Sequence, residues 1–422
     1  MPLPQKRADL LKTNPLIEIT LLHRAMRLEL EAMCAAARAL AASAADEAPA
    51  LANLRRRFRA FDAVFASHSA AEDDVVFPAL AACAGRDVAS HAAAEHIDEV
   101  ALVDGAAAAL DRAAARGRCD AGTVAALQDL KEKLADHMDH EEAEIFPLLA
   151  SVPELELKRM VGLVLGARPA DVLELTIRLQ VQHLEPALAR HVLATMCDVA
   201  RGTNFRRWLD HALGAAAAGP PAPAPPAAAA ATAPPPPPRR RCPRHGHAAR
   251  IAAPCCGALV CCRRCHDARP GECGQAMDAR RVTDMVCAEC GVRGPVGRRC
   301  ASCAVPQASY YCGHCKHFDD SGAHTFHCPF CDVCRRGHGL GVDFHHCMRC
   351  NMCVDITQIA THVCTGAGQA CGACGGDLAA TPDRVVVLGC GHPAHARCAA
   401  GPLPRLRAAH RITTCLSYRS PN

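Results

Sequence analysis

The chain of 422 residues has few aromatic side chains and no long apolar run. Aromatic residues make up only 3%, and although half of the residues are hydrophobic, much of that share is alanine. No stretch of roughly 18 apolar residues occurs, so we predict no membrane-spanning helix and no membrane partner. The first residues also lack an apolar stretch that could form the core of a secretory signal. We therefore expect the protein in the cytoplasm, the nucleus or both.

Cysteine, in contrast, is abundant. The chain has 29 cysteines, of which four precede residue 200 and 25 follow Arg241. An odd number, repeated CxxC spacing and no secretion signal argue against a disulfide framework. Thiolates at CxxC spacing in a reducing compartment are typical of structural zinc sites, so several zinc ions are expected.

The charge is distributed unevenly. Residues 1–213 hold 24 basic and 31 acidic residues, a net charge of −7, and the remainder holds 23 and 12, a net charge of +11. A basic half can indicate nucleic acid as a partner. Here the simpler explanation is that a tetrathiolate zinc site carries a charge of about −2, which lysine and arginine offset. We therefore do not predict nucleic acid binding.

A Pro/Ala segment, residues 214–241, separates two dissimilar regions. Its prolines favour extended polyproline II, which makes it a semi-rigid linker. The region before it is rich in alanine and leucine with helical periodicity. The region after it has too few large apolar residues to fold without metal.

Four segments before the linker have apolar residues at helical spacing, within residues 16–33, 58–75, 89–103 and 127–148. Such segments with modest connections predict an up-down-up-down four-helix bundle. The predicted fold class is thus multidomain, an all-α bundle followed by small zinc-stabilised, loop-rich α+β modules.

Each of the four apolar stripes contains a histidine: His23, His68, His96 and His137. In two stripes a glutamate, Glu72 or Glu141, follows its histidine one turn later on the same face. One buried histidine is usually a satisfied core residue, but a carboxylate in an apolar core needs a cation. Four imidazoles and two carboxylates suit two metal ions; iron fits this mixed set best, and manganese or zinc stay open.

The stretches HSAAEDDVVFPAL (68–80) and HMDHEEAEIFPLL (137–149) resemble the haemerythrin-like domains of plant BRUTUS and HRZ proteins. AEHIDE around His96 and LLHRAM around His23 are similar to the other two ligand helices of that family. The resemblance implies a haemerythrin-like bundle over residues 15–150 that holds two irons. The implied iron ligands are His23, His68, Glu72, His96, His137 and Glu141.

The sequence does not assign a definite role to the other histidines and glutamates near these ligands. Glu95 and Glu99 could bridge the metals, and the spacing does not decide it. His91 and His140 are interpreted as surface residues or outer neighbours of the ligands. Residues 151–213, with the single tryptophan Trp208, are expected to add helices that pack against the bundle.

The cysteine-rich region resembles the same family. APCCGALVCCRRCHD (253–267) is similar to a CHY finger, placed at 242–282, and residues 287–355 through to Cys364 are similar to a CTCHY finger, placed at 283–364. Residues 371–415 resemble an incomplete RING-H2 finger. Closed Cys/His shells leave no position for a substrate, so the predicted role is structural and no catalytic residue is proposed. The zinc ligands expected are Cys242, His245, Cys255, Cys256, Cys262, Cys265, His266, Cys287, Cys290, Cys300, Cys303, Cys312, Cys315, His327, Cys328, Cys331, Cys334, His345, His346, Cys347, Cys350, Cys353, His362, Cys364, Cys371, Cys374, Cys390, His392, His395 and Cys398.

Two departures from the family pattern matter. At the start of the CHY finger, Ala249 stands where a cysteine belongs and Glu272 where a histidine belongs, so the first zinc needs His245, His247 or Cys273 as a substitute. In the RING, the first and third ligand pairs are complete, but Cys390 and His392 lack their partner pair and Cys415 offers a single thiol. Ala373 also stands where an apolar residue usually docks the ubiquitin-conjugating enzyme.

The resemblance implies an iron-responsive regulator that works as a RING-type ubiquitin ligase. Its expected partners are a ubiquitin-conjugating enzyme and protein targets such as transcription factors. The incomplete RING keeps a second hypothesis open, a non-catalytic metal-binding scaffold or competitor. A third is a simple iron- or oxygen-binding protein with a structural tail.

Overall fold

The computed structural model describes residues 17–43, 48–85, 87, 89–217, 241–269 and 273–362, and near the C-terminal end 364, 370, 371, 373–376, 378, 385–387 and 393–400. The chain forms two compact units, residues 1–201 and 202–422. Within the described residues, no helix is long and apolar enough to cross a membrane.

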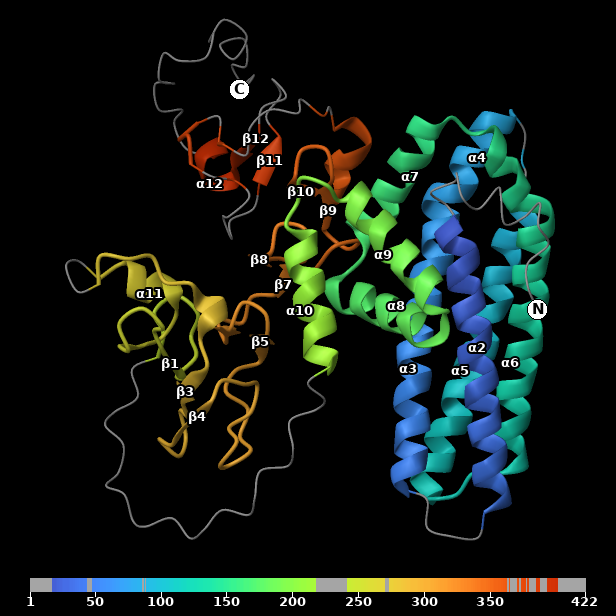
Figure 1. The fold of residues 1–422 in the computed structure, drawn as a ribbon, viewed down its shortest axis with the longest axis horizontal. Coiled ribbons are helices and arrows are strands. Elements are labelled where there is room, and N and C mark those ends of the chain that lie inside the picture. The colour runs from blue at the N-terminus through green and yellow to red at the C-terminus, as the bar shows by residue number, and fades with distance from the viewer. Residues whose placement is uncertain are drawn as a thin grey trace, which may run out of the picture. The chain divides into compact units, whose positions relative to one another are not determined.

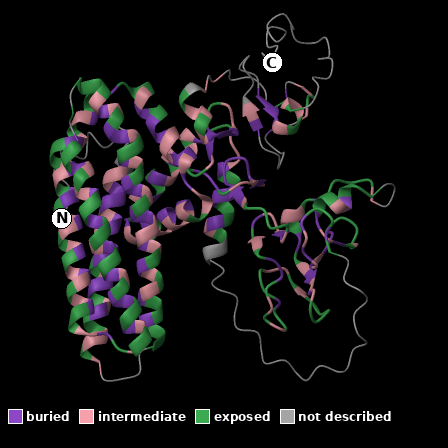
Figure 2. Ribbon diagram, turned by 180° about the vertical axis from the view of Figure 1, so that it is seen from behind, coloured by how far each residue is buried: buried purple, intermediate pink, exposed green. Residues whose placement is uncertain are grey.

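The first unit is built on four long helices (Figure 1). α2 (Ile17–Ala42) lies against α3 (Ala48–Ala71) and α6 (Ala121–His140), and α5 (Ser90–Arg116) lies against α3 and α6 as well. The short α4 (Phe77–Ala84) continues the α3 segment. Buried positions follow the inner faces of these helices (Figure 2). This arrangement confirms the predicted bundle.

Local sequence explains where these helices begin and end. Asp120 caps α6 by accepting a hydrogen bond from the Thr123 N–H at 2.8 Å. α5 ends at Gly117, whose φ of 66° is left-handed and costs glycine little. Three shorter helices, α7 (Glu154–Ala167), α8 (Ala170–His183) and α9 (Pro186–Val199), complete the unit, with α8 packed on α2 and α3.

Both predicted histidine–glutamate helices change geometry at the glutamate. π-helical turns occupy Glu72–Val76 and Glu141–Ile145, and the second leads into a 3-10 segment, Phe146–Ser151. Each π turn is followed within two residues by a proline, Pro78 or Pro147, which has no N–H to continue the α-helical ladder. Single π turns inside helices are frequent at functional sites.

The second unit consists of small antiparallel sheets and short helices. A four-stranded sheet in the order β2-β1-β3-β4 contains β1 (Arg250–Ala252), β2 (Leu259–Val260), β3 (Asp284–Val286) and β4 (Arg293–Pro295). Four hairpins follow, namely β5–β6 (Tyr310–Cys312, His317–Asp319), β7–β8 (Thr325–Cys328, Val333–Arg336), β9–β10 (Phe344–Cys347, Met352–Asp355) and β11–β12 (Val385–Val387, Pro393–His395). The helical pieces are α10 (Phe205–Ala217), α11 (Arg263–Asp267), α12 (Ala396–Ala399) and two 3-10 turns (Ala279–Arg281, Ile356–Thr361). The predicted zinc-finger-like modules are therefore present.

Helix α10 departs from the expectation that residues 151–213 all pack on the bundle, because it belongs to the second unit. The Phe205 ring stacks on Phe330 at 5.3 Å between centroids, and Trp208 stacks on Phe205 at 5.7 Å and is only 4% exposed. The Asn204 N–H donates to the Phe330 carbonyl at 2.8 Å, and Arg207 pairs with buried Asp332. The apolar face of α10 is thus buried within the second unit, so α10 is part of the finger module.

Candidate metal centres

The structure brings the four histidines of the bundle together in two pairs. Nε2 of His23 lies 2.8 Å from Nε2 of His68, and Nε2 of His96 lies 3.1 Å from Nε2 of His137. All four rings are at most 5% exposed. Each helix contributes one ring, so the close approach of the pairs results from packing of the four apolar stripes.

Glu72 and Glu141 lie between the two pairs. Glu72 approaches His68 at 3.2 Å and both His23 and His96 at 3.8 Å. Glu141 approaches His137 at 3.4 Å and His23 at 3.5 Å. Each carboxylate therefore faces at least one nitrogen of each pair, which is the placement that a bridging ligand requires.

The two carboxylates lack the hydrogen bonds that buried oxygens normally make. Within the described residues, no donor makes a hydrogen bond to any of their four oxygens, and both side chains are at most 1% exposed. Burial, followed by repulsion from Glu141, raises the pKa of Glu72 well above its ordinary value. Burial, followed by repulsion from Glu99, raises the pKa of Glu141 to about 9. Orphaned carboxylates of this kind need a proton or a cation.

Three outer carboxylates hold the far side of the rings. Nδ1 of His23 lies 3.1 Å from Glu142, Nδ1 of His96 lies 3.0 Å from Asp73, and Nδ1 of His137 lies 3.1 Å from Glu95. A carboxylate on Nδ1 fixes the tautomer that leaves Nε2 available to a metal. Glu95, whose role the sequence left open, is thus an outer partner, contacted also by His91 and His140. These three outer residues lie close in sequence to ligands, but spacing alone does not reveal their contacts.

Glu99, the other residue left open, is fully buried on α5. Its oxygens accept no hydrogen bond from the described residues, and Oε1 lies 3.5 Å from Nδ1 of His137. Burial raises its pKa to about 8. It faces the outer nitrogen of His137 and not the inner one, so its position favours an outer role.

The donor set fits two metal ions. Two imidazoles and two shared carboxylate oxygens would surround each ion, with His23, His68, Glu72 and Glu141 at one position and His96, His137 and the same glutamates at the other. Mixed nitrogen and oxygen ligation with positions left over suits redox-active iron, which would supply the oxidation-state and oxygen chemistry of such a centre. The protein's own contribution is to orient the rings and to exclude water.

The second unit gathers its cysteines and histidines into compact sets of four. In five of them the ligand atoms lie within 4.8 Å of one another. Those sets are Cys255, Cys256, His266 and Cys273; Cys287, Cys290, Cys300 and Cys303; Cys312, Cys315, His327 and Cys334; Cys328, Cys331, His346 and Cys353; and Cys347, Cys350, His362 and Cys364. Three thiols and an imidazole, or four thiols, at this separation match tetrahedral zinc.

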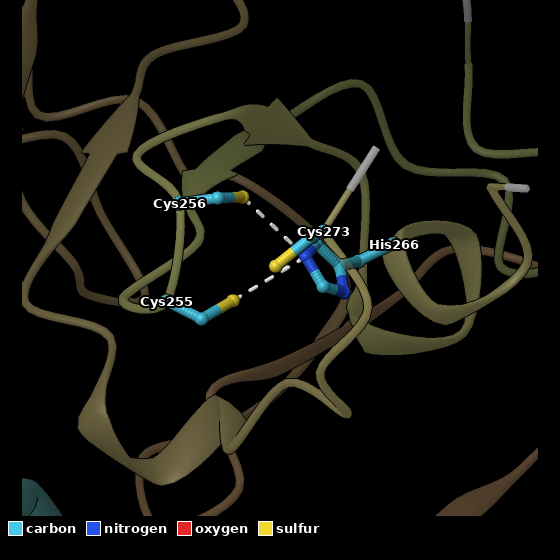
Figure 3. A group of neighbouring side chains, drawn as sticks. All are labelled: Cys255, Cys256, His266 and Cys273. Carbon is cyan, nitrogen blue, oxygen red and sulfur yellow. Dashed lines mark hydrogen bonds between the residues drawn. The ribbon is translucent and has the colours of Figure 1, made fainter. Parts of the chain in front are cut away.

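Figure 3 shows the set that departs from the family pattern. Nε2 of His266 lies 3.3 Å from the sulfur of Cys255 and 3.5 Å from that of Cys256, and Cys273 closes the fourth side. On the outer face Nδ1 of His266 lies 2.9 Å from Asp267. Cys273, one of three possible substitutes in the sequence, therefore stands in for the missing histidine.

The other end of the CHY finger gathers around Cys242, whose sulfur lies 3.9 Å from those of Cys262 and Cys265. Hydrogen bonds, first from Cys262 and then from His247, contribute to lowering the pKa of the Cys242 thiol to about 3. His247 is fully buried beside it, whereas His245 points to Asp319 at 3.4 Å. The structure thus places His247, rather than the expected His245, next to these thiols.

In the CTCHY region Asp332 lies on the side of the His327 ring that faces away from the cysteine sulfurs. His327 presents Nδ1 to Cys315 at 3.3 Å, and its Nε2 lies 3.8 Å from Asp332. On β9, His346 faces the thiols of Cys328 and Cys331. His345 precedes it on the same strand and therefore points to the opposite face, outside that set.

Four of the CxxC turns share a backbone feature. The residue after the second cysteine has a positive φ in each, between 48° and 58°, at Ala304, Lys316, Asp332 and Asn351. Left-handed geometry costs a non-glycine residue of order 1 kcal/mol. In the same turns amide groups face sulfur, as where the Cys315 N–H donates to Cys312 at 3.3 Å. Strain of this kind is consistent with thiolates that hold a metal.

The described part of the RING remnant also forms one set. Nδ1 of His395 lies 3.4 Å from the sulfur of Cys374 and 3.7 Å from that of Cys398, and the His395 N–H donates to Cys371 at 3.5 Å. Cys390, His392 and Cys415, which bear on the second RING site, lie outside the described residues. Ala373 is half-buried and packs on the apolar cluster that joins this remnant to the β9–β10 hairpin.

Comparison with known proteins gives matches to both units. Residues 14–149 match the Hemerythrin HHE cation binding domain, and residues 242–311 match the CHY zinc finger. The chain is 40% identical over 162 residues to zinc finger protein BRUTUS of Arabidopsis thaliana, which is 37% of this chain and 12% of that protein. It is 35% identical over 158 residues to E3 ubiquitin-protein ligase SRFP1 of Oryza sativa subsp. japonica, covering 37% of this chain and 60% of that one. Each match therefore spans less than two thirds of the relative.

Proposed function

Because this chain is of the BRUTUS/HRZ type, with a haemerythrin-type domain ahead of CHY-type fingers, we propose that it is an iron-responsive regulator that directs ubiquitination of target proteins. The bundle would bind two irons through His23, His68, Glu72, His96, His137 and Glu141. The fingers would hold zinc and recruit the ubiquitin-conjugating enzyme and the target, in the nucleus or the cytoplasm.

The observation that carries the iron part is the pair of buried glutamates with orphaned oxygens between two histidine pairs. The ligase part rests on the similarity to the rice E3 ubiquitin-protein ligase SRFP1 and on the set formed by Cys371, Cys374, His395 and Cys398. A RING performs no covalent step itself. It holds the charged conjugating enzyme near the target, which is catalysis by proximity.

Ubiquitin transfer by the full-length protein, iron-loaded and iron-free, with a panel of conjugating enzymes tests this proposal. We expect transfer that differs between the two metal states, because the bundle is proposed as the sensor. Equal transfer in both states would refute the sensing role. No transfer at all, from a folded protein with its zinc in place, would refute the ligase role.

A second candidate function is a scaffold or competitor without ligase activity. One observation favours it: Ala373, at the position that docks the conjugating enzyme in the family, is small and packs against its own module. Little area remains there for a partner. The scaffold proposal predicts that the protein binds a target but discharges ubiquitin from no conjugating enzyme.

A further inference from the structure

Two histidines and one aspartate meet in the second unit, outside the five compact sets described above. Nδ1 of His245 lies 3.4 Å from Oδ2 of Asp319, and Nε2 of His317 lies 3.7 Å from the same oxygen. The two rings stand edge to face, with their centroids 4.5 Å apart and 89° between their planes. The rings of His23 and His68 in the bundle have nearly the same arrangement, at 4.7 Å and 85°. Two ring nitrogens therefore approach one carboxylate oxygen.

Backbone contacts hold this cluster in place. The Asp320 N–H donates to the His245 carbonyl at 2.7 Å. Gly246, with a φ of 70°, lies so close that a Cβ atom there would be 2.8 Å from the Asp320 carbonyl oxygen. Asp319 is fixed through Oδ1, which accepts hydrogen bonds from the N–H and the hydroxyl of Ser321 at 2.8 and 2.6 Å. The loop that carries His245 is thus anchored on the end of β6, and Oδ2 stays beside the two rings.

The distances in the cluster fit a shared metal ion better than hydrogen bonds. Nδ1 of His245 forms no hydrogen bond with any residue that the structure describes, although His245 is only 7% exposed. Nε2 of His317 is too far from Oδ2 to form a hydrogen bond with it. Ligand atoms at about 2.0–2.2 Å from one tetrahedral ion lie roughly 3.3–3.6 Å apart, close to the spacing in this cluster. A buried nitrogen without a partner indicates that a ligand belongs there.

The surroundings of the cluster favour one class of ion. The three side chains line a cavity of about 190 Å³, which leaves room for water as a further ligand. The same cavity is lined by Asp332 and by five arginines, namely Arg263, Arg264, Arg280, Arg335 and Arg336. This positive lining disfavours Mg²⁺ and Ca²⁺, which bind to sites rich in carboxylate oxygen. Imidazole nitrogen, in contrast, suits zinc and iron.

We propose that His245, His317 and Asp319 form an exchangeable site for a divalent transition metal, zinc or ferrous iron. Two imidazole nitrogens and one carboxylate oxygen hold the ion, and water from the cavity completes its shell. No thiolate is among these ligands, so the site binds zinc more weakly than the cysteine sets do. Dialysis therefore removes its ion and leaves the resident zinc in place. The inference depends neither on the iron centre of the bundle nor on ligase activity.

Arg336 competes with a metal for Asp319. Its Nη2 lies 3.6 Å from Oδ2 of Asp319, and its side chain is 39% exposed. The Thr325 hydroxyl also donates to this oxygen, at 3.2 Å, and a second lone pair remains for a metal. A metal on Oδ2 is repelled by the Arg336 charge, so removing that charge should strengthen metal binding. A cluster that serves only as a structural ion pair predicts no such gain.

Cobalt(II) is the probe, because its absorption reports the type of its ligands. Full-length protein is dialysed, its iron and zinc contents are measured, and cobalt uptake is followed by equilibrium dialysis and absorption. His317→Leu should bind one cobalt ion fewer than the wild type, with an affinity for that ion at least about tenfold lower, because even the loss of an outer partner costs about that much. Arg336→Gln should bind the ion roughly threefold more tightly. His338→Ala is the matched control, since His338 is 58% exposed and pairs with Asp343.

Zinc or ferrous iron in excess should displace this cobalt, and magnesium should not; displacement by neither transition metal would overturn the proposal. Equal cobalt uptake by the wild type and His317→Leu, or an equal loss in His338→Ala, would overturn it as well. So would thiolate-to-cobalt charge-transfer absorption from the extra ion, which would place that ion in a cysteine set. Should His317→Leu misfold and lose resident zinc, Arg336→Gln decides, since tighter binding supports the site and unchanged affinity overturns it.

Discussion

Replacing Glu141 by glutamine should remove about 2 kcal/mol of the pH dependence of stability of the metal-free bundle between pH 6.5 and pH 8. The pKa of Glu141 is about 9 in the folded protein, against an ordinary value of 4.5. Between these two values the folded state binds a proton that the unfolded state does not. Stability therefore falls as the pH rises through this window.

The magnitude follows from the size of the shift. One pH unit in the window corresponds to about 1.4 kcal/mol, so holding the proton costs about 3 kcal/mol at pH 6.5 and about 5 kcal/mol at pH 8. Burial lowers the pKa of His137 to about 4, which opposes this trend between that value and 6.5. Above pH 6.5 His137 is neutral in both the folded and the unfolded state. The loss of about 2 kcal/mol of stability that Glu141 causes between pH 6.5 and pH 8 is therefore not offset by this histidine.

The assay is urea unfolding of residues 1–201 in the presence of a chelator, followed by far-ultraviolet circular dichroism at pH 6.5 and pH 8. Glutamine cannot ionise, so Glu141→Gln should lose about 2 kcal/mol of the difference between the two pH values, whatever its absolute stability. Glu72 and Glu99, whose pKa values burial also raises, should keep their own part of the difference. Glu144→Gln on the same π turn is the control, because Glu144 is 74% exposed. A pH dependence in Glu141→Gln equal to that of the wild type would refute the reasoning.

His68→Ala should lower the iron content of the full-length protein from about two per chain toward one and leave zinc unchanged, because the two metals use separate side chains; metal analysis measures both, and loss of zinc would contradict this. Removing zinc with a chelator should shift the emission of Trp208, the single tryptophan, to longer wavelength, because the finger that buries it depends on metal. Unchanged emission would show that α10 is held by other means. His247→Ala should cost one zinc per chain and His245→Ala none, since His247 is the residue that lies against the Cys242 thiol. The reverse result would make His245 the ligand.

Much of the site could be predicted because its signals are local. A histidine in each apolar stripe and a glutamate one turn later follow from helical periodicity, and CxxC spacing follows from the turn that brings two sulfurs to one ion. Contacts between residues on different helices could not be predicted from spacing in the sequence. Asp73, Glu95 and Glu142 are ordinary surface-type residues in the sequence, and only helix packing turns them toward Nδ1 of a ligand.

The sequence by itself determined the two-part organisation, the bundle and the abundance of zinc-type spacing, because periodicity and short-range spacing are properties of neighbouring residues. Tertiary structure alone decided which partner each group meets. It placed Cys273 with Cys255, His247 with Cys242, and Trp208 on the finger module. It also placed His245 and His317 beside Asp319. Such choices depend on residues distant in the chain, whose approach is fixed by packing and by the cost of leaving buried polar groups unpaired.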